Sequence, residues 1–138
     1  MKSTEVRPRS LSLKLMSLVA VVFGLLSIKE GGSVLFGDGV ARAQAGQYVP
    51  FIVWFNFLAG FVYVGAGLAL WWRNRIAAWL SIGIVVATVL AFAALGVFVA
   101  QGGGFEVRTV AAMALRTVIW LLIAIGAWKM FRALPAAR

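Results

Sequence analysis

The chain has 138 residues, of which 63% are hydrophobic and 12% charged, and its mean hydropathy is +0.99. Soluble domains usually carry about 25% charged residues, so this composition excludes an ordinary water-soluble fold. The absence of cysteine and histidine excludes disulfides, thiol chemistry, metal ligands of either type and histidine acid–base catalysis.

The apolar residues fall into four long blocks separated by short polar segments. Each block is long enough to cross a bilayer and is apolar on all sides, whereas a helix of a soluble bundle has a charged face. We therefore predict an all-α, integral membrane four-helix bundle that forms a single transmembrane domain over residues 1–138. The predicted helices cover about 11–28, 50–72, 76–100 and 107–131.

The first predicted helix, 11–28, follows a short basic tail and ends where Lys29 and Glu30 interrupt the apolar run. A cleaved signal peptide is the alternative, because Ala41-Arg42-Ala43 resembles a small-residue cleavage site. The apolar run stops well before that site, which favours an uncleaved helix. Residues 29–49 are predicted to form an outer loop, either an ordinary one or a short re-entrant turn.

The second predicted helix, 50–72, carries small and polar residues on one face. Asn56, Gly60, Tyr63 and Gly67 follow one another at i, i+4, i+7 and i+11. Glycines allow a neighbouring helix to approach closely, and the amide and the phenol offer hydrogen bonds to it. We predict that Gly60 and Gly67 serve helix packing.

The third predicted helix, 76–100, follows a tight turn at 73–75, so that the second and third helices must be antiparallel neighbours. It contains no ionisable residue. Its Ser81 and Thr88 can bond to backbone carbonyls of their own helix. It is therefore expected to serve packing or to face lipid.

The fourth predicted helix, 107–131, contains Arg116 well inside its apolar span. At about 1.5 Å per residue, Arg116 lies roughly 13 Å from the outer end of its helix, Asn56 about 9 Å and Tyr63 about 20 Å. Glu30 and Glu106 are expected near the outer surface. An arginine in hydrocarbon costs at least about 2.5–3.5 kcal/mol, so that another group must meet it.

Two interpretations of this polar cluster compete. In the structural one, Arg116 pairs with Glu30 or Glu106 and bonds to Asn56, Tyr63 and free carbonyls, which fixes the helix arrangement. In the functional one, the same residues line an outward-open pocket in which Arg116 holds an anionic or carbonyl-bearing ligand. No catalytic residues and no metal or cofactor site are predicted, because no nucleotide loop, ligand cluster or nucleophile–base pair is present.

The basic residues lie mostly on one side of the predicted bundle. Nine basic residues and one acidic residue flank the termini and the 73–75 turn, whereas three of each sign lie on the opposite side. The positive-inside rule places both termini in the cytoplasm. We predict a location in a bacterial cytoplasmic (inner) membrane. The basic ends suit anionic lipid head groups of the bilayer, so that no nucleic-acid partner is needed to explain the net charge of +9.

The segment Asn56-Phe-Leu-Ala-Gly60, followed by Gly65-Ala-Gly67, Arg73 and Ala77, resembles the second-helix pattern of the DoxX-like family of small four-helix membrane proteins. Lys29-Glu30-Gly31-Gly32 is similar to that family's first loop. Asn56 stands where an acid is frequent in the family, so that no carboxylate role is carried over to it. The resemblance implies four helices and, as in some members, association with quinone-linked oxidoreductases.

The small-residue face and the lack of catalytic groups predict a non-enzymatic subunit or scaffold that contacts a membrane-complex partner or a second copy of itself. The alternative is a small permease or ligand-binding protein whose outward pocket uses Arg116, Asn56 and Tyr63. A membrane enzyme comes third, because the chain lacks an acid–base pair of convincing spacing.

Overall fold

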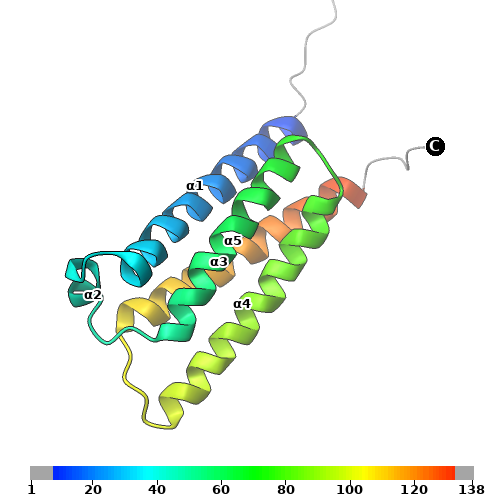
Figure 1. The fold of residues 1–138 in the computed structure, drawn as a ribbon. Coiled ribbons are helices and arrows are strands. Elements are labelled where there is room, and N and C mark those ends of the chain that lie inside the picture. Colours follow the sequence, from blue (N-terminus) through cyan, green and yellow to red (C-terminus); the bar gives the residue numbers. More distant parts are fainter. Residues whose placement is uncertain (1–7, 133–138) are drawn as a thin grey trace, which may run out of the picture.

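The computed structural model describes residues 8–132, and all the regular secondary structure in that range is helical (Figure 1). Its elements are α1 (Pro8–Phe36), α2 (Val40–Ala45), α3 (Pro50–Trp71), α4 (Ile76–Ala100) and α5 (Val107–Arg132). All except α2 are long and apolar enough to span a membrane. The protein is therefore an all-α membrane bundle of four spanning helices, as its composition predicts.

The two ends of the bundle differ in what they contain (Figure 1). The start of α1, the turn between α3 and α4 and the end of α5 lie together at what we call the terminal end. α2 and the 101–106 connection lie at the opposite end, which we call the loop end. α1 packs along α3 and α4 packs along α5, whereas α1 and α5 make few contacts.

The α1–α3 contact brings two backbones together at the middle of the bundle. A Cβ added to Gly60 would lie 2.8 Å from the carbonyl oxygen of Gly24, and one added to Gly24 would lie 2.7 Å from that of Gly60. Closer to the terminal end, Ser17 Oγ donates a 2.6 Å hydrogen bond to the carbonyl of Gly67. The small-residue face of α3 thus packs against α1 of the same chain, and it is not open to a partner.

The first helix is longer than its sequence pattern predicts. The predicted loop 29–49 begins only after Phe36, and the short helix α2 occupies part of it. Two consecutive glycines and a charged pair are local signals for a helix end, but packing overrides them here. A Cβ on Gly31 would lie 2.9 Å from Phe57 Cβ, so that only glycine fits this close approach to α3.

The extended end of α1 is held by further contacts with α3 and α2. The Phe36 ring packs against the rings of Trp54 and Phe57, at centroid distances of 5.7 and 5.5 Å. Arg42 of α2 donates hydrogen bonds to the carbonyls of Val34 and Leu35, at 2.7 and 2.8 Å. These carbonyls belong to the last turn of α1 and have no partner within the helix. Arg42 therefore acts as a cap that lets α1 continue past its glycines.

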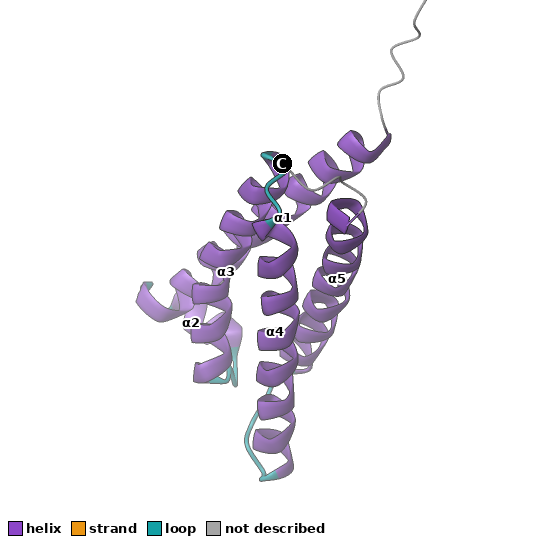
Figure 2. Ribbon diagram, turned by 90° about the vertical axis from the view of Figure 1, so that its right-hand side faces the viewer, coloured by secondary structure: helices purple, strands orange, loops and turns teal. Residues whose placement is uncertain are grey.

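α4 is the helix most open to its surroundings. Only 17% of its most apolar stretch is buried, against 33% for α5. Ser81 and Thr88 bond to the carbonyls of Ala77 and Ile84, both at 2.7 Å, as expected for hydroxyls in an apolar helix. α4 stands in front of the bundle in Figure 2, which agrees with the prediction of a packing or lipid-facing element.

Candidate functional site

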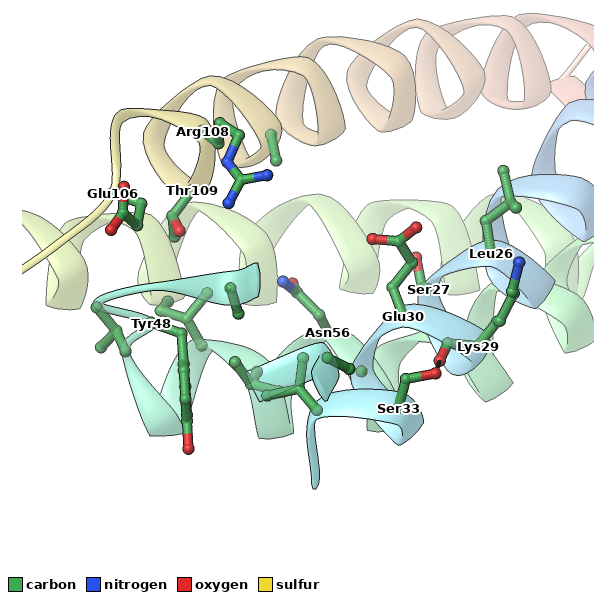
Figure 3. A pocket seen from close by; sticks show the side chains of 18 of the residues that line it. Leu26, Ser27, Lys29, Glu30, Ser33, Tyr48, Asn56, Glu106, Arg108 and Thr109 are labelled. Atoms are coloured by element: carbon green, nitrogen blue, oxygen red, sulfur yellow. Dashed lines mark hydrogen bonds between the residues drawn. The ribbon is translucent and has the colours of Figure 1, made fainter. Parts of the chain in front are cut away.

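A cavity of about 720 Å³ lies at the loop end, between α1, α2, α3 and the start of α5 (Figure 3). Its size falls in the range of small-molecule sites. The side chains around it are unusually polar for the inside of a membrane bundle. The polar and charged residues that line it are Ser27, Lys29, Glu30, Ser33, Gln44, Tyr48, Asn56, Glu106, Arg108, Thr109 and Arg116.

Arg116 of α5 forms the deep end of this cavity and is 7% exposed. Its Nη1 donates a 2.9 Å hydrogen bond to Ser27 Oγ of α1 and a longer one, 3.4 Å, to Tyr63 Oη of α3. The guanidinium also lies over the rings of Phe23 and Tyr63, with Cζ 5.0 and 5.6 Å from their centroids. Three helices therefore position this one cation.

The surroundings of Arg116 are rigid on the side away from the cavity. Tyr63 is fully buried, with its ring 4.7 Å from that of Trp120 and 6.0 Å from that of Phe23. Phe23 and Ser27 are one helical turn apart on α1, as Arg116 and Trp120 are on α5, so that each pair presents a single face to Tyr63. The phenol and the guanidinium are fixed by this packing.

Arg116 keeps hydrogen-bonding capacity that the protein does not use. Its Nε is buried without a partner, and Nη2 donates to no group in residues 8–132. No carboxylate in the described part of the chain lies within ion-pair distance of it. An arginine offers five N–H donors, and here one nitrogen supplies all the bonds. The predicted pairing with Glu30 or Glu106 is absent.

Glu30 and Asn56 lie at one level of the bundle, because their neighbours Gly31 and Phe57 touch. Glu30 was expected near the outer surface, but the extension of α1 places it beside Asn56, about 9 Å along the helix from Pro50. Figure 3 shows both side chains directed into the space between α1, α3 and α5. Asn56 Oδ1 is buried without a partner, and the exposed Glu30 carboxylate accepts no hydrogen bond in residues 8–132.

The mouth of the cavity is held together by two charged residues at the start of α5, Glu106 and Arg108. Glu106 accepts a 2.9 Å hydrogen bond from the backbone N–H of Gln47. Arg108 Nη2 donates a 2.8 Å bond to the carbonyl of Gln44. Glu106 thus ties the α2–α3 connection to the start of α5 and does not reach Arg116.

The cavity also has a side opening between α1 and α5. Leu26 of α1 lines it and is 50% exposed, and Ala112 of α5 lines it and is also exposed. Towards the terminal end Met16 of α1 lies against Gly126 of α5, and at mid-bundle Arg116 of α5 bonds to Ser27 of α1, below this opening. The cavity is therefore accessible from the side of the bundle, where lipid lies in a membrane, as well as from the loop end.

Of the residues singled out in the sequence, Arg116, Asn56, Glu30 and Glu106 line this cavity, and Tyr63 bonds to Arg116 from beneath it. Gly60 and Gly67 lie apart, in the α1–α3 interface.

Sequence reasoning did not identify Ser27, which forms the shortest hydrogen bond to Arg116, as a site residue. It also did not identify Phe23, Lys29 and Arg108 as site residues. Ser27 precedes Glu30 by three residues and shares a helix face with it, a signal that the predicted helix end at 28 concealed.

No known protein family, curated protein or solved structure matches this chain. The resemblance to the DoxX-like family therefore stays a prediction. Within residues 8–132, no group of three acidic, histidine or cysteine side chains is placed to hold a metal ion.

Proposed function

We propose that this protein binds a small ligand through an anionic group at Arg116, as a permease or a ligand-binding membrane protein. The observation that carries the proposal is a buried guanidinium that lines a 720 Å³ cavity and meets no carboxylate. Intramembrane charges are costly, and those that serve structure are normally paired. An anion in the cavity would supply the missing partner for Nε and Nη2 of Arg116.

The direction in which the cavity opens follows from the distribution of charge. The terminal end carries the excess of basic residues. We therefore place that end and both termini on the cytoplasmic side of a bacterial inner membrane. The loop end, with α2 and the cavity mouth, then faces outward. A ligand would enter from the outside or from the outer leaflet.

The proposal is tested by binding of simple anions to the purified full-length protein in detergent. Inorganic phosphate and benzoate are titrated while the thermal unfolding midpoint is recorded, since a ligand of the folded state raises that midpoint. At least one probe should stabilise the wild-type protein, and Arg116→Lys should bind it about 10- to 100-fold more weakly, because lysine cannot replace a guanidinium fork.

Arg132→Lys is the matched control, because Arg132 is exposed at the terminal end and should leave binding unchanged. If Arg116→Lys binds a stabilising probe like wild type, or if no anionic probe, with or without an ammonium group, stabilises the protein, the proposal is wrong. Flux of the bound probe into proteoliposomes then separates the two forms of the proposal: flux indicates a permease, and binding without flux a ligand-binding protein.

A second candidate function is a non-enzymatic subunit or scaffold of a membrane complex. The small-residue face of α3 is buried against α1, whereas α4 is the least buried of the four spanning helices. An apolar groove of about 460 Å³ runs between α3 and α4 and is lined by side chains that include Leu58, Val62, Trp79 and Gly83. This groove is the observation that favours lateral contact.

Gly83→Leu tests the second candidate, because Gly83 lines the groove and a Cβ there meets nothing within 4 Å, so that the larger side chain would occupy the groove. Gly96→Leu is the control, since Gly96 has equally open space on the same helix outside the groove. Loss of a crosslinked complex in native membranes with Gly83→Leu alone would support the subunit. Equal crosslinking in both variants would argue against it.

A further inference from the structure

We propose that the ligand at Arg116 is a zwitterion, with an acidic group bound by Arg116 and an ammonium group bound by Glu30 and Asn56. This inference rests on the proposed function and adds the chemical class of the ligand. It follows from the order of donors and acceptors along the cavity, from the deep end towards the loop end.

The charged group at the deep end of the cavity offers only donors. Arg116 has no acceptor atom, and its Nε and Nη2 are without partners in residues 8–132. Ser27 and Tyr63 hold its other terminal nitrogen in place. This end is complementary to a carboxylate or a phosphate, whose oxygens accept the free N–H groups of a guanidinium.

One turn closer to the loop end, the free groups are acceptors. Glu30 follows Ser27 by three residues on the same face of α1, an axial distance of about 4.5 Å. Asn56 lies at the level of Glu30, and its Oδ1 is buried without a partner. A carboxylate and an amide oxygen together suit an ammonium, which has three donors and no acceptor.

The opposite charges of Arg116 and Glu30 share one cavity and do not pair with each other. A group that carries both charges a few bonds apart would satisfy both at once. A simple anion would meet Arg116 but lie beside the Glu30 carboxylate, which repels it. The other charged lining residues do not offset this repulsion at the same place: Arg108 and Glu106 bond to the backbone at the mouth, and Lys29 leads away from Asn56 in Figure 3.

Two sources can supply an acidic group joined to an ammonium by a short linker. A free solute can enter from the loop end, and a zwitterionic lipid head group can enter from the bilayer through the side opening between Leu26 and Ala112. The recognition chemistry is the same in both cases, so the experiment separates them by two arms.

In the solution arm, the full-length protein is placed in nanodiscs of phosphatidylglycerol, which has no ammonium. Phosphoethanolamine and ethyl phosphate are titrated, two probes that differ in the ammonium group. The wild-type protein should bind phosphoethanolamine about 10- to 100-fold more tightly, the range for a hydrogen bond to a charged group. Glu30→Gln should remove this preference.

Asp38→Asn is the matched control, because Asp38 is an exposed loop-end carboxylate outside the cavity and within residues 8–132 accepts a hydrogen bond only from the N–H of Val40. It should keep the full preference for phosphoethanolamine. Asn56→Asp gives a second, opposite test that does not depend on Glu30→Gln being folded: a second carboxylate beside Glu30 should increase the preference.

In the lipid arm, nanodiscs containing phosphatidylethanolamine and phosphatidylglycerol in equal amounts are used, and lipid that stays on the protein is identified by native mass spectrometry. Selective retention of phosphatidylethanolamine by wild type and Asp38→Asn, lost in Glu30→Gln, assigns the site to a lipid head group. Preference for phosphoethanolamine in solution without lipid retention assigns it to a free solute.

The outcomes that overturn the inference are distinct from those that overturn the proposed function. If ethyl phosphate binds as tightly as phosphoethanolamine, still depends on Arg116 and is unaffected by Glu30→Gln, the zwitterion is wrong and anion binding stands. If neither the probes nor either lipid binds in an Arg116-dependent way, the proposed function fails as well.

Discussion

The terminal half and the loop half of this bundle are built by opposite means. Towards the terminal end, helices meet through close-packed small and aromatic side chains, and residues such as Ala66, Leu70 and Trp120 are fully buried. Towards the loop end, the helices separate around a 720 Å³ cavity with unpartnered polar groups. A binding site needs rigid support. Here the packed half fixes Tyr63 and Arg116, and the open half leaves the cavity side of Arg116 free for a ligand.

The largest expected effect comes from disturbing the packed half. Gly60→Leu would drive a side chain into the Gly24 carbonyl and Ile28, both 2.8 Å from the position of a Cβ. Because the contact is with backbone, we expect a loss of about 3 kcal/mol in stability or a failure to fold. Thermal unfolding in detergent measures it, with Gly65→Leu as the control, since a Cβ there meets nothing within 4 Å. Equal effects of the two substitutions would contradict the packing described for α1 and α3.

The open half should respond differently to loss of its central residue. Arg116→Met removes hydrogen bonds from a charged donor to Ser27 and Tyr63, each worth about 1.5–3 kcal/mol. It also removes a buried cation without a counter-ion, which costs at least about 2.5–3.5 kcal/mol and so offsets most of that loss. We expect stability to change by less than about 1.5 kcal/mol in either direction, while anion binding falls about 10- to 100-fold. Unfolding midpoints with and without the anionic probe measure both quantities. Severe destabilisation would instead favour the structural interpretation of Arg116.

A smaller and more local effect is expected at the loop end, where α2 caps the last turn of α1. Arg42→Gln removes the two hydrogen bonds that cap the carbonyls of Val34 and Leu35. We expect a loss of about 1 kcal/mol, the usual size for a helix cap, confined to the last turns of α1. Hydrogen exchange should accelerate for the amides of residues 33–37 and stay unchanged in α4. Unchanged exchange at 33–37 would show that packing of Phe36 alone holds this extension.

The smallest expected effect comes from a single hydrogen bond inside the packed half. Ser17→Ala removes the 2.6 Å bond to the Gly67 carbonyl but leaves the close approach of the helices intact. Hydrogen bonds between membrane helices contribute about 0.6 kcal/mol on average, so we expect a loss of that order. Ser33→Ala is the comparison, because the Ser33 hydroxyl donates to the Lys29 carbonyl of its own helix, so that its loss should cost less. If the two losses are equal, the bond between α1 and α3 contributes nothing beyond local helix structure.

The sequence predicted most of the fold because spanning a bilayer is a property of each segment by itself. The starts of α3, α4 and α5 at Pro50, Ile76 and Val107 agree with the predicted helices, since apolar length and flanking polar residues mark them locally. The end of α1 was predicted eight residues too early. Its extension depends on Phe57 and Arg42, which lie elsewhere in the chain and leave no signal near residue 28.

The candidate site was predictable only in part, because its central cation is a local feature of the sequence but its contacts are not. A lone arginine inside an apolar helix is visible in the sequence, and so is its need for partners. Which partners it finds depends on how each helix is rotated about its axis and how far it is shifted along it. Ser27 and Glu30 lie three residues apart on α1, yet Ser27 accepts a hydrogen bond from Arg116 and Glu30 forms no ion pair with it.

The sequence by itself determined the solvent of this protein, the number of its spanning helices and the position of one costly cation, because these depend on hydrophobicity summed over neighbouring residues. The tertiary structure alone decided that the α3 glycines pack on α1, that Glu30 lies beside Asn56, and that Arg116 faces a cavity in place of a carboxylate. The physical reason is that the close contact of Gly24 with Gly60 sets the register of α1 against α3. That register brings Glu30 of α1 to the level of Asn56 of α3 and leaves Ser27 as the α1 partner of Arg116.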